Sequence, residues 1–285
     1  FGGGTPTVLS AAQWRRLARI VEEHFYFADD AEVTAEANPN SLNAEQLRVW
    51  RDWRVTRVSV GVQSFDDAEL HALGRLHNAC QARDAISASL ASGFAVSLDL
   101  MFALPGQTFA GWAASLHEAV RSGAGHISLY QLSIEKGTPW ETLDQTKLPD
   151  GYEMYRWAQW YLPRKGFGPY EISNFAKPGL CSRHNLNYWR FGDYLGLGAG
   201  AHGKLSTANG VIREMRHKHP VAYLDGAKQR NFIQESHTVG QDELAFEFMM
   251  NALRLTDGVP AELFAERTGL ALDSVEASLA TARRE

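Results

Sequence analysis

The chain has 285 residues, of which 45% are hydrophobic and 21% are charged. This composition is ordinary for a soluble globular protein and excludes a disordered, collagen-like or coiled-coil chain. The length fits one large domain or two smaller ones. The formal net charge of −5 argues against an extended nucleic-acid surface, which needs clustered lysine and arginine. No apolar run approaches the roughly 20 residues that a membrane span requires.

Short β-rich runs alternate with helical patterns over the first 175 residues. We predict helices after the N-cap Ser10 and at 41–53, 80–91, 109–121 and 152–162. We predict strands at 32–36, 57–62, 95–101, 126–132 and 170–173. Such alternation indicates βαβ units and a parallel sheet. Because it fades near residue 175, and eight units usually take about 250 residues, we predict an α/β fold with a partial TIM-type (β/α)6 barrel.

The later part of the chain differs in character, so we expect three segments: 1–175, 176–235 and 236–285. The middle segment is dense in glycine, asparagine, tyrosine and histidine. The last is mainly helical and winged-helix-like, with helices predicted at 243–255, 260–268 and 273–282. Residues 241–285 hold nine acidic and four basic residues, which argues against DNA binding and favours a small packing or docking domain.

The two cysteines, Cys80 and Cys181, cannot by themselves form a disulfide framework or a closed thiolate metal site. A reduced, cytoplasmic protein is therefore expected. The sequence opens on Phe1 and a glycine turn (GGGTP, 2–6), with no initiator methionine and no signal peptide. Since such a turn follows a strand, we expect a further N-terminal piece, and the helical pattern at the far end indicates that the last domain is truncated.

Five polar residues lie at or just past predicted strand ends and recur every 27 to 36 positions: Thr5, Glu36, Gln63, Asp99 and Gln131. In a barrel the carboxyl ends of parallel strands converge on one mouth, so these side chains are expected to face a single cavity. Two alternatives stay open. The residues could be ordinary polar groups solvated by loops, or Glu36 and Asp99 could be the paired carboxylates of a glycoside hydrolase.

An ordered set of motifs covers nearly the whole chain. It comprises 2–6 (GGGTP), 35–39 (AEANP), 61–65 (GVQSF), 73–77 (LGRLH), 99–108 (DLMFALPGQT), 170–175 (YEISNF), 184–189 (HNLNYW) and 198–203 (GAGAHG). This set resembles the radical S-adenosylmethionine (SAM) superfamily. Within it the chain resembles the subfamily that contains oxygen-independent coproporphyrinogen dehydrogenase (HemN) and the heme chaperones (HemW). The last two motifs look more like HemW.

The resemblance implies a radical SAM barrel in which one set of residues binds S-adenosylmethionine: Gly3, Gly4, Thr5, Glu36, Gln63, Arg75 and Asp99. Glycines allow close backbone approach, carboxylates accept from hydroxyl or amino groups, and an arginine fork suits a carboxylate. The alternatives are a tight turn, solvated acids and a surface arginine. The resemblance also implies a 4Fe-4S cluster held by a C-x3-C-x2-C loop, which these residues lack. We expect its cysteines upstream of Phe1 and no metal ligands in this chain.

Two functions remain open on this resemblance, and no catalytic residue is assigned. A chaperone would bind heme and pass it to acceptor apoproteins, whereas a dehydrogenase would oxidatively decarboxylate coproporphyrinogen III. Imidazole is a common axial ligand of heme iron and aromatic rings pack on porphyrins, so His184, Tyr188 and His202 are the candidate heme residues. Expected partners are heme and heme-accepting apoproteins, without nucleic acid or a membrane span, which leaves room for peripheral contact with a membrane protein.

Overall fold

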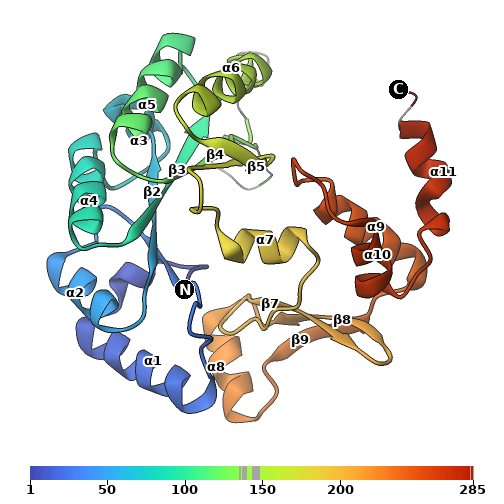
Figure 1. Cartoon of the computed structure of the whole chain (residues 1–285). Coiled ribbons are helices and arrows are strands. Elements are labelled where there is room, and N and C mark those ends of the chain that lie inside the picture. Colours follow the sequence, from blue (N-terminus) through green and yellow to red (C-terminus); the bar gives the residue numbers. More distant parts are fainter. Residues whose placement is uncertain (135, 137–139, 143–147, 283, 285) are drawn as a thin grey trace. The chain divides into compact units, whose positions relative to one another are not determined.

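The computed structural model describes residues 1–134, 136, 140–142, 148–282 and 284, and it divides into two compact units (Figure 1). The first is Phe1–Cys181 and the second is Ser182–Glu285. The three-segment organisation expected from the sequence, with boundaries at 175 and 235, stays a prediction. No helix in the described part of the chain is long and apolar enough to cross a bilayer.

The first unit is built on a six-stranded sheet with the order β1-β2-β3-β4-β6-β5. Its strands are β1 (Thr34–Ala37), β2 (Arg57–Gln63), β3 (Ala95–Phe102), β4 (His126–Gln131), β5 (Gly168–Glu171) and β6 (Asn174–Ala176). Neighbours from β1 to β4 run parallel, whereas β6 pairs antiparallel with both β4 and β5. The α/β class is confirmed, but the strand predicted at 170–173 is part of a closing hairpin rather than a further βα repeat.

Helices alternate with the parallel strands in the predicted order. They are the 3-10 helix η1 (Pro6–Val8) and α1 (Ala11–His24), α2 (Ala44–Asp52), α3 (Asp67–Ala72), α4 (Ala79–Ala91), α5 (Phe109–Arg121) and α6 (Gly151–Arg164). Ser10 caps α1 in a reciprocal capping box with Gln13, as its sequence indicates. The short α3 was not predicted; Asp66 caps it by accepting two backbone N–H groups.

The sheet separates an apolar face from a polar one because side chains alternate along each strand. In β2, Val58, Val60 and Val62 are buried in the core beneath the helices. The residues between them belong to the opposite face, where Ser59 and Gln63 lie. The same alternation in β3 assigns Asp99 to that polar face. TIM barrels usually fill this interior with branched apolar side chains, so a polar interior indicates a ligand site.

The second unit combines a three-stranded antiparallel sheet with helices. Its elements are α7 (Arg183–Trp189), β7 (His202–Thr207), β8 (Gly210–Arg216), α8 (Pro220–Lys228), β9 (Ile233–Thr238), α9 (Gln241–Ala252), α10 (Ala261–Thr268) and α11 (Asp273–Ala282). The three helices predicted at the end of the chain are confirmed, whereas the sheet was not predicted. One core joins Phe191 and Val211 to Phe248 of α9, so residues on both sides of position 235 pack together.

Candidate functional site

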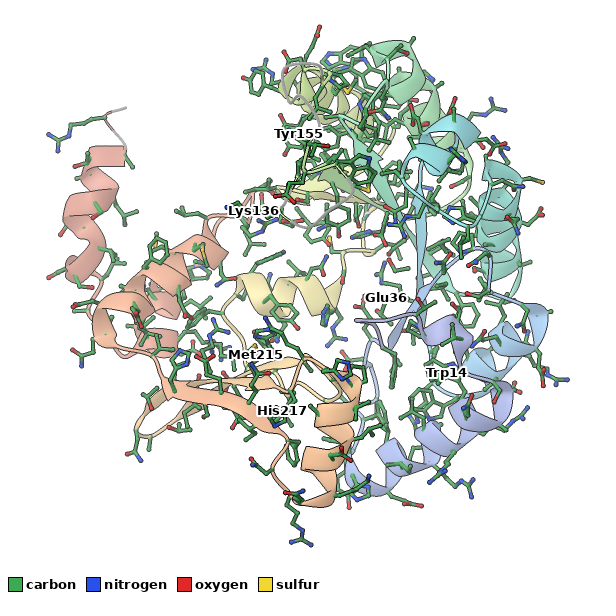
Figure 2. All side chains as sticks on the ribbon, turned by 180° about the vertical axis from the view of Figure 1, so that it is seen from behind. Trp14, Glu36, Lys136, Tyr155, Met215 and His217 are labelled. Carbon is green, nitrogen blue, oxygen red and sulfur yellow. The ribbon has the colours of Figure 1, made fainter. Side chains whose placement is uncertain are left out.

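A cavity of about 180 Å³ lies in the first unit where β1, β2 and β3 end. Its lining residues are Gly4, Thr5, Pro6, Glu36, Ala37, Asn38, Ser59, Gly61, Gln63, Arg75 and Asp99. Six of the seven residues predicted to bind the cofactor therefore meet around one space. The seventh, Gly3, lies beside it and donates its backbone N–H to Oε2 of Glu36 at 3.2 Å. Glu36 is labelled in Figure 2.

Gln131 does not share this cavity, contrary to the prediction that five strand-end residues would face one mouth. Its amide lies against Gly151, where a side-chain carbon would come within 2.8 Å of Nε2. The physical reason is the two-residue period of the strand. In the β3–β4 register Asp99 is opposite Ser128, so Ser128 and Tyr130 share its face, and Gln131 belongs to the other.

The glycine turn seats the carboxylate of Glu36. A Cβ atom built on Gly2 would overlap that carboxylate, so any other residue here would force the Glu36 side chain to shift. Gly3 has a φ of +81° and supplies the N–H that Oε2 accepts. The sequence singled out Gly3 and Gly4, and the geometry adds Gly2, whose missing side chain leaves room for the Glu36 carboxylate.

Asp99 is a partly buried carboxylate held by serine hydroxyl groups. The Oγ of Ser59, on the neighbouring strand, donates to Oδ2 at 3.2 Å. Burial raises the pKa of Asp99 to about 6, hydrogen bonds from Ser128 and Ser59 offset part of this rise, and the nearby charge of Glu36 adds to it. Burial, with the charge of Asp99, also raises the pKa of Tyr130 to about 12.

Gln63 closes the cavity from the end of β2 in a strained backbone conformation. Its φ is +66°, in the left-handed region that is unfavourable for residues other than glycine. The side chain folds back over Gly61, whose missing Cβ would lie 3.1 Å from the Nε2 of Gln63. Strain of this kind persists where surrounding contacts impose it, and it concentrates at ligand sites.

Two polar groups in the cavity lack a protein partner among the described residues. Arg75, an exposed residue on the loop after α3, lines the cavity, and its guanidinium forms no side-chain hydrogen bond or ion pair with the residues that the structure describes; partial desolvation lowers its pKa. The Oδ1 atom of Asn38 is buried with no donor in the described part of the chain. An unpaired cation and an unpaired acceptor beside two carboxylates suit a ligand that carries a carboxylate and several donors. Asn38 was not singled out from the sequence.

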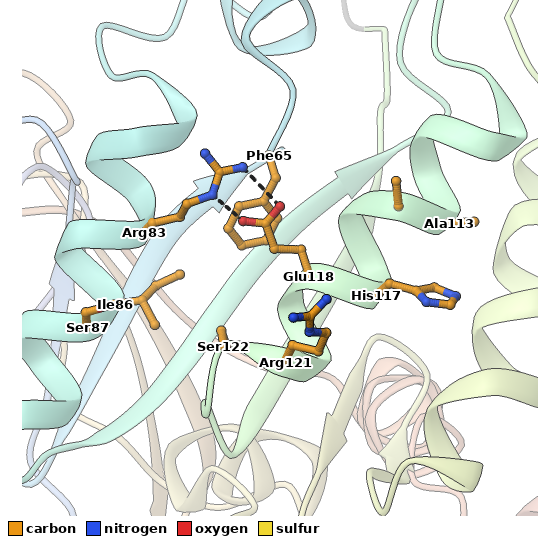
Figure 3. A pocket seen from close by; sticks show the side chains of 10 residues that line it. Phe65, Arg83, Ile86, Ser87, Ala113, His117, Glu118, Arg121 and Ser122 are labelled. Atoms are coloured by element: carbon orange, nitrogen blue, oxygen red, sulfur yellow. Dashed lines mark hydrogen bonds and ion pairs between the residues drawn. The ribbon is translucent and has the colours of Figure 1, made fainter.

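Another cavity, of about 790 Å³, lies elsewhere in the first unit, between α4 and α5 (Figure 3). Arg83 of α4 and Glu118 of α5 form an ion pair across it, with Nη2 and Oε2 3.0 Å apart. These charges satisfy each other, and none of the predicted site residues lines this cavity. It lies between barrel helices rather than at the strand ends where such folds bind ligands.

The candidate heme residues lie in the second unit, where two of them, His184 and Tyr188, belong to a chain of aromatic contacts. The rings of His184 and Tyr188 pack edge-to-face with their centroids 4.7 Å apart, and the ring centroids of Tyr188 and Tyr194 are 4.4 Å apart. Tyr194 lines a cavity of about 240 Å³ together with His202. Buried Lys204 fixes the intervening loop, because its Nζ donates to the Phe191 carbonyl at 3.0 Å.

Comparisons with known proteins agree with the two-part architecture. Residues 1–119 match the model of the radical SAM superfamily, and residues 239–282 match that of the HemN C-terminal domain. The heme chaperone HemW of Haemophilus influenzae is 40% identical over 281 residues, covering 97% of this chain and 72% of the relative. The chain belongs to the HemW family.

Other relatives support the same assignment. The HemW protein of Escherichia coli is 37% identical, covering 98% of this chain and 74% of the relative. The solved structure of coproporphyrinogen III oxidase (HemN) from E. coli superimposes with a TM-score of 0.80 at 20% identity, covering 97% of this chain and 67% of that one. At this identity the likeness shows the fold alone, namely the HemN-type radical SAM fold. For this HemW family member, the partial barrel is thus confirmed.

Replacing Asp99 by asparagine is expected to stabilise the fold more as pH rises. The raised pKa means that the folded state binds the Asp99 proton more tightly than the unfolded state does. The contribution of Asp99 to the free energy of unfolding therefore falls as pH rises from about 4 through 6. Asp99→Asn removes this loss and should gain about 1–3 kcal/mol in free energy of unfolding at pH 8. Urea titrations of both proteins at pH 5 and pH 8 measure it.

The control for this series is Asp29→Asn, at an exposed turn position. Its effect on the free energy of unfolding should stay within about 0.5 kcal/mol at both pH values. A gain for Asp99→Asn that is the same at pH 5 and pH 8 would contradict the desolvation argument.

At position 63, glycine is expected to be more stable than alanine by about 1 kcal/mol, because only alanine keeps the left-handed penalty. Both variants lose the amide, so the difference isolates backbone strain. Gln131, at the end of β4 and outside the left-handed residues, is the matched control. At position 131 the alanine variant should have a free energy of unfolding about 0.5–1 kcal/mol higher than that of the glycine variant. Thermal unfolding of the four variants measures these differences. If glycine and alanine rank in the same order of stability at both positions, strain at Gln63 is refuted.

Proposed function

We propose that this protein is a heme chaperone on a radical SAM fold, which binds heme and transfers it to acceptor apoproteins. The observation that carries the proposal is 40% identity to a heme chaperone over 97% of the chain. The alternative, an oxygen-independent coproporphyrinogen III dehydrogenase, is less favoured because the HemN structure shares the fold at 20% identity.

We further propose that the first-unit cavity holds S-adenosylmethionine. The unpaired guanidinium of Arg75 matches the methionyl carboxylate as a bidentate fork. Glu36 and Asp99 would accept from the ligand's hydroxyl and amino groups, and both carboxylates favour its positive charge. Gly3, Gly4 and Thr5 would offer backbone groups and a hydroxyl, while Gln63 would orient the ligand from the rim.

A 4Fe-4S cluster, when bound, supplies single electrons to the sulfonium of S-adenosylmethionine. Its ligands in such proteins are cysteine thiolates. Cys80 is exposed and Cys181 is partly buried 101 positions later, and no three cysteine, histidine or acidic side chains in the described part of the chain gather as a metal site. We therefore propose that the cluster ligands lie outside these 285 residues.

In the second unit, we propose that heme contacts His184, Tyr188 and His202. The aromatic chain from His184 through Tyr188 to Tyr194, and the cavity that His202 lines, support this assignment. Imidazole nitrogens ligate heme iron, and tyrosine rings pack on porphyrin faces. A cytoplasmic location and peripheral contact with a membrane-bound acceptor complete the proposal. Cys80 and Cys181 do not form a disulfide with each other, which fits a reducing compartment.

The experiment that tests the chaperone function is heme titration followed by transfer. Heme added to the full-length protein should shift the Soret band at micromolar concentration, and apomyoglobin added afterwards should acquire that heme. An unchanged Soret band at tens of micromolar heme would contradict the proposal. Incubation with coproporphyrinogen III, S-adenosylmethionine and a reductant should leave the porphyrinogen unchanged, whereas protoporphyrinogen formation would favour the dehydrogenase.

Arg75→Ala is expected to weaken S-adenosylmethionine binding by about 1.5–3 kcal/mol, the range for a hydrogen bond to a charged group. Isothermal titration of the full-length, cluster-loaded protein measures the dissociation constant. Arg121→Ala is the matched control, because Arg121 is an exposed arginine in the separate cavity between α4 and α5. An affinity equal to wild type in Arg75→Ala would remove this residue from the site.

A further inference from the structure

We propose that His77 is a positioning residue for the cavity of about 180 Å³, where it holds in place the loop that brings Gln63 and Arg75 to S-adenosylmethionine. The inference rests on the proposed cofactor site and deepens it. His77 ends the motif at 73–77, in which only Arg75 has been given a role. Its side chain is buried and is not among the residues that line the cavity, so it would act on the ligand through its neighbours.

One end of this loop is a strained turn that places Gln63. The N–H of Ser64 donates to the carbonyl of Val62 at 2.8 Å, which closes a three-residue turn around Gln63. The φ of +66° at the central residue is typical of the rare, strained form of the γ-turn. Strain of this kind persists only where neighbouring groups impose it, so the turn needs support from the residues around it.

The other end of the loop carries Arg75, which lines the same cavity although it lies 12 positions after Gln63. Arg75 follows α3 through a C-cap at Gly74, whose φ is +65°. The N–H of Gly74 donates to the carbonyl of His71, and that of Arg75 donates to the carbonyl of Leu70, each at 2.9 Å. This pair of bonds is the Schellman motif. It fixes the backbone of Arg75 relative to α3 but not relative to β2.

The imidazole of His77 connects the two ends of the loop. Its Nε2 lies 3.0 Å from the carbonyl oxygen of Val62, the same oxygen that accepts the N–H of Ser64 in the γ-turn. Because a carbonyl oxygen can only accept, the proton of the neutral ring is on Nε2. Arg75 is two residues before His77, so this bond holds the Arg75 backbone against the turn that places Gln63.

The environment of the ring indicates a role in positioning. Burial lowers the pKa of His77, the bond to Val62 opposes this, and the charge of Arg75 lowers the pKa further. The ring therefore acts as a neutral hydrogen-bond donor. Its Nδ1 is buried without a donor in the described part of the chain, which costs free energy. An apolar side chain of similar size would avoid that cost, so fold stability alone does not account for a histidine at this position.

The test is the affinity for S-adenosylmethionine, measured by isothermal titration of the full-length, cluster-loaded protein. His77→Leu removes the donor at similar volume and should weaken binding by about tenfold, because the loop loses its bond to β2. His77→Gln retains an N–H donor and should bind within about threefold of wild type. His71→Leu is the matched control at an exposed histidine of α3 and should bind as wild type does.

A second background separates positioning from general destabilisation. In Arg75→Ala protein, His77→Leu should weaken binding by less than about threefold, because the guanidinium that the loop positions is already gone. The thermal midpoint of His77→Leu should change by no more than about 4 °C. In the unliganded variant, hydrogen exchange should be faster at residues 63–77.

Three results would overturn the inference and leave the cofactor site in place. They are wild-type affinity in His77→Leu, an equal loss of affinity with and without Arg75, and a fall in the thermal midpoint well beyond the expected range, which would make His77 a structural residue. Absence of any S-adenosylmethionine binding by the wild-type protein would instead refute the proposed cofactor site.

Discussion

Desolvation of a carboxylate at the mouth of the parallel sheet is the constraint on which the first unit's site depends. Asp99 belongs to the polar face of β3, between strands that contribute serine hydroxyls from Ser59 and Ser128. Hydrogen bonds from those hydroxyls offset only part of the rise in the pKa of Asp99 that burial causes, so this pKa remains at about 6. A ligand that brings hydrogen-bond donors or positive charge would relieve this desolvation cost.

Most of the first unit could be predicted from the sequence because its helices and strands are marked by local sequence patterns. Capping residues such as Ser10 and Asn78 mark helix starts, and the spacing of valines in β2 gives both the strand and its buried face. Strand parity then decides which polar residues meet, and applying it to β4 would have excluded Gln131 in advance. Arg75 has no such signal, since it lies on a loop after α3, and only the motif resemblance drew attention to it.

The second unit was less predictable because its strands lack the expected alternation of apolar and polar residues. Every residue of β9 after Ile233 is exposed, and β7 buries Lys204 where a strand pattern would place an apolar side chain. That lysine is satisfied by partners distant in sequence, among them the carboxylate of Asp193 at 2.8 Å. A buried charge that is paired by folding cannot be distinguished from a surface lysine in the sequence.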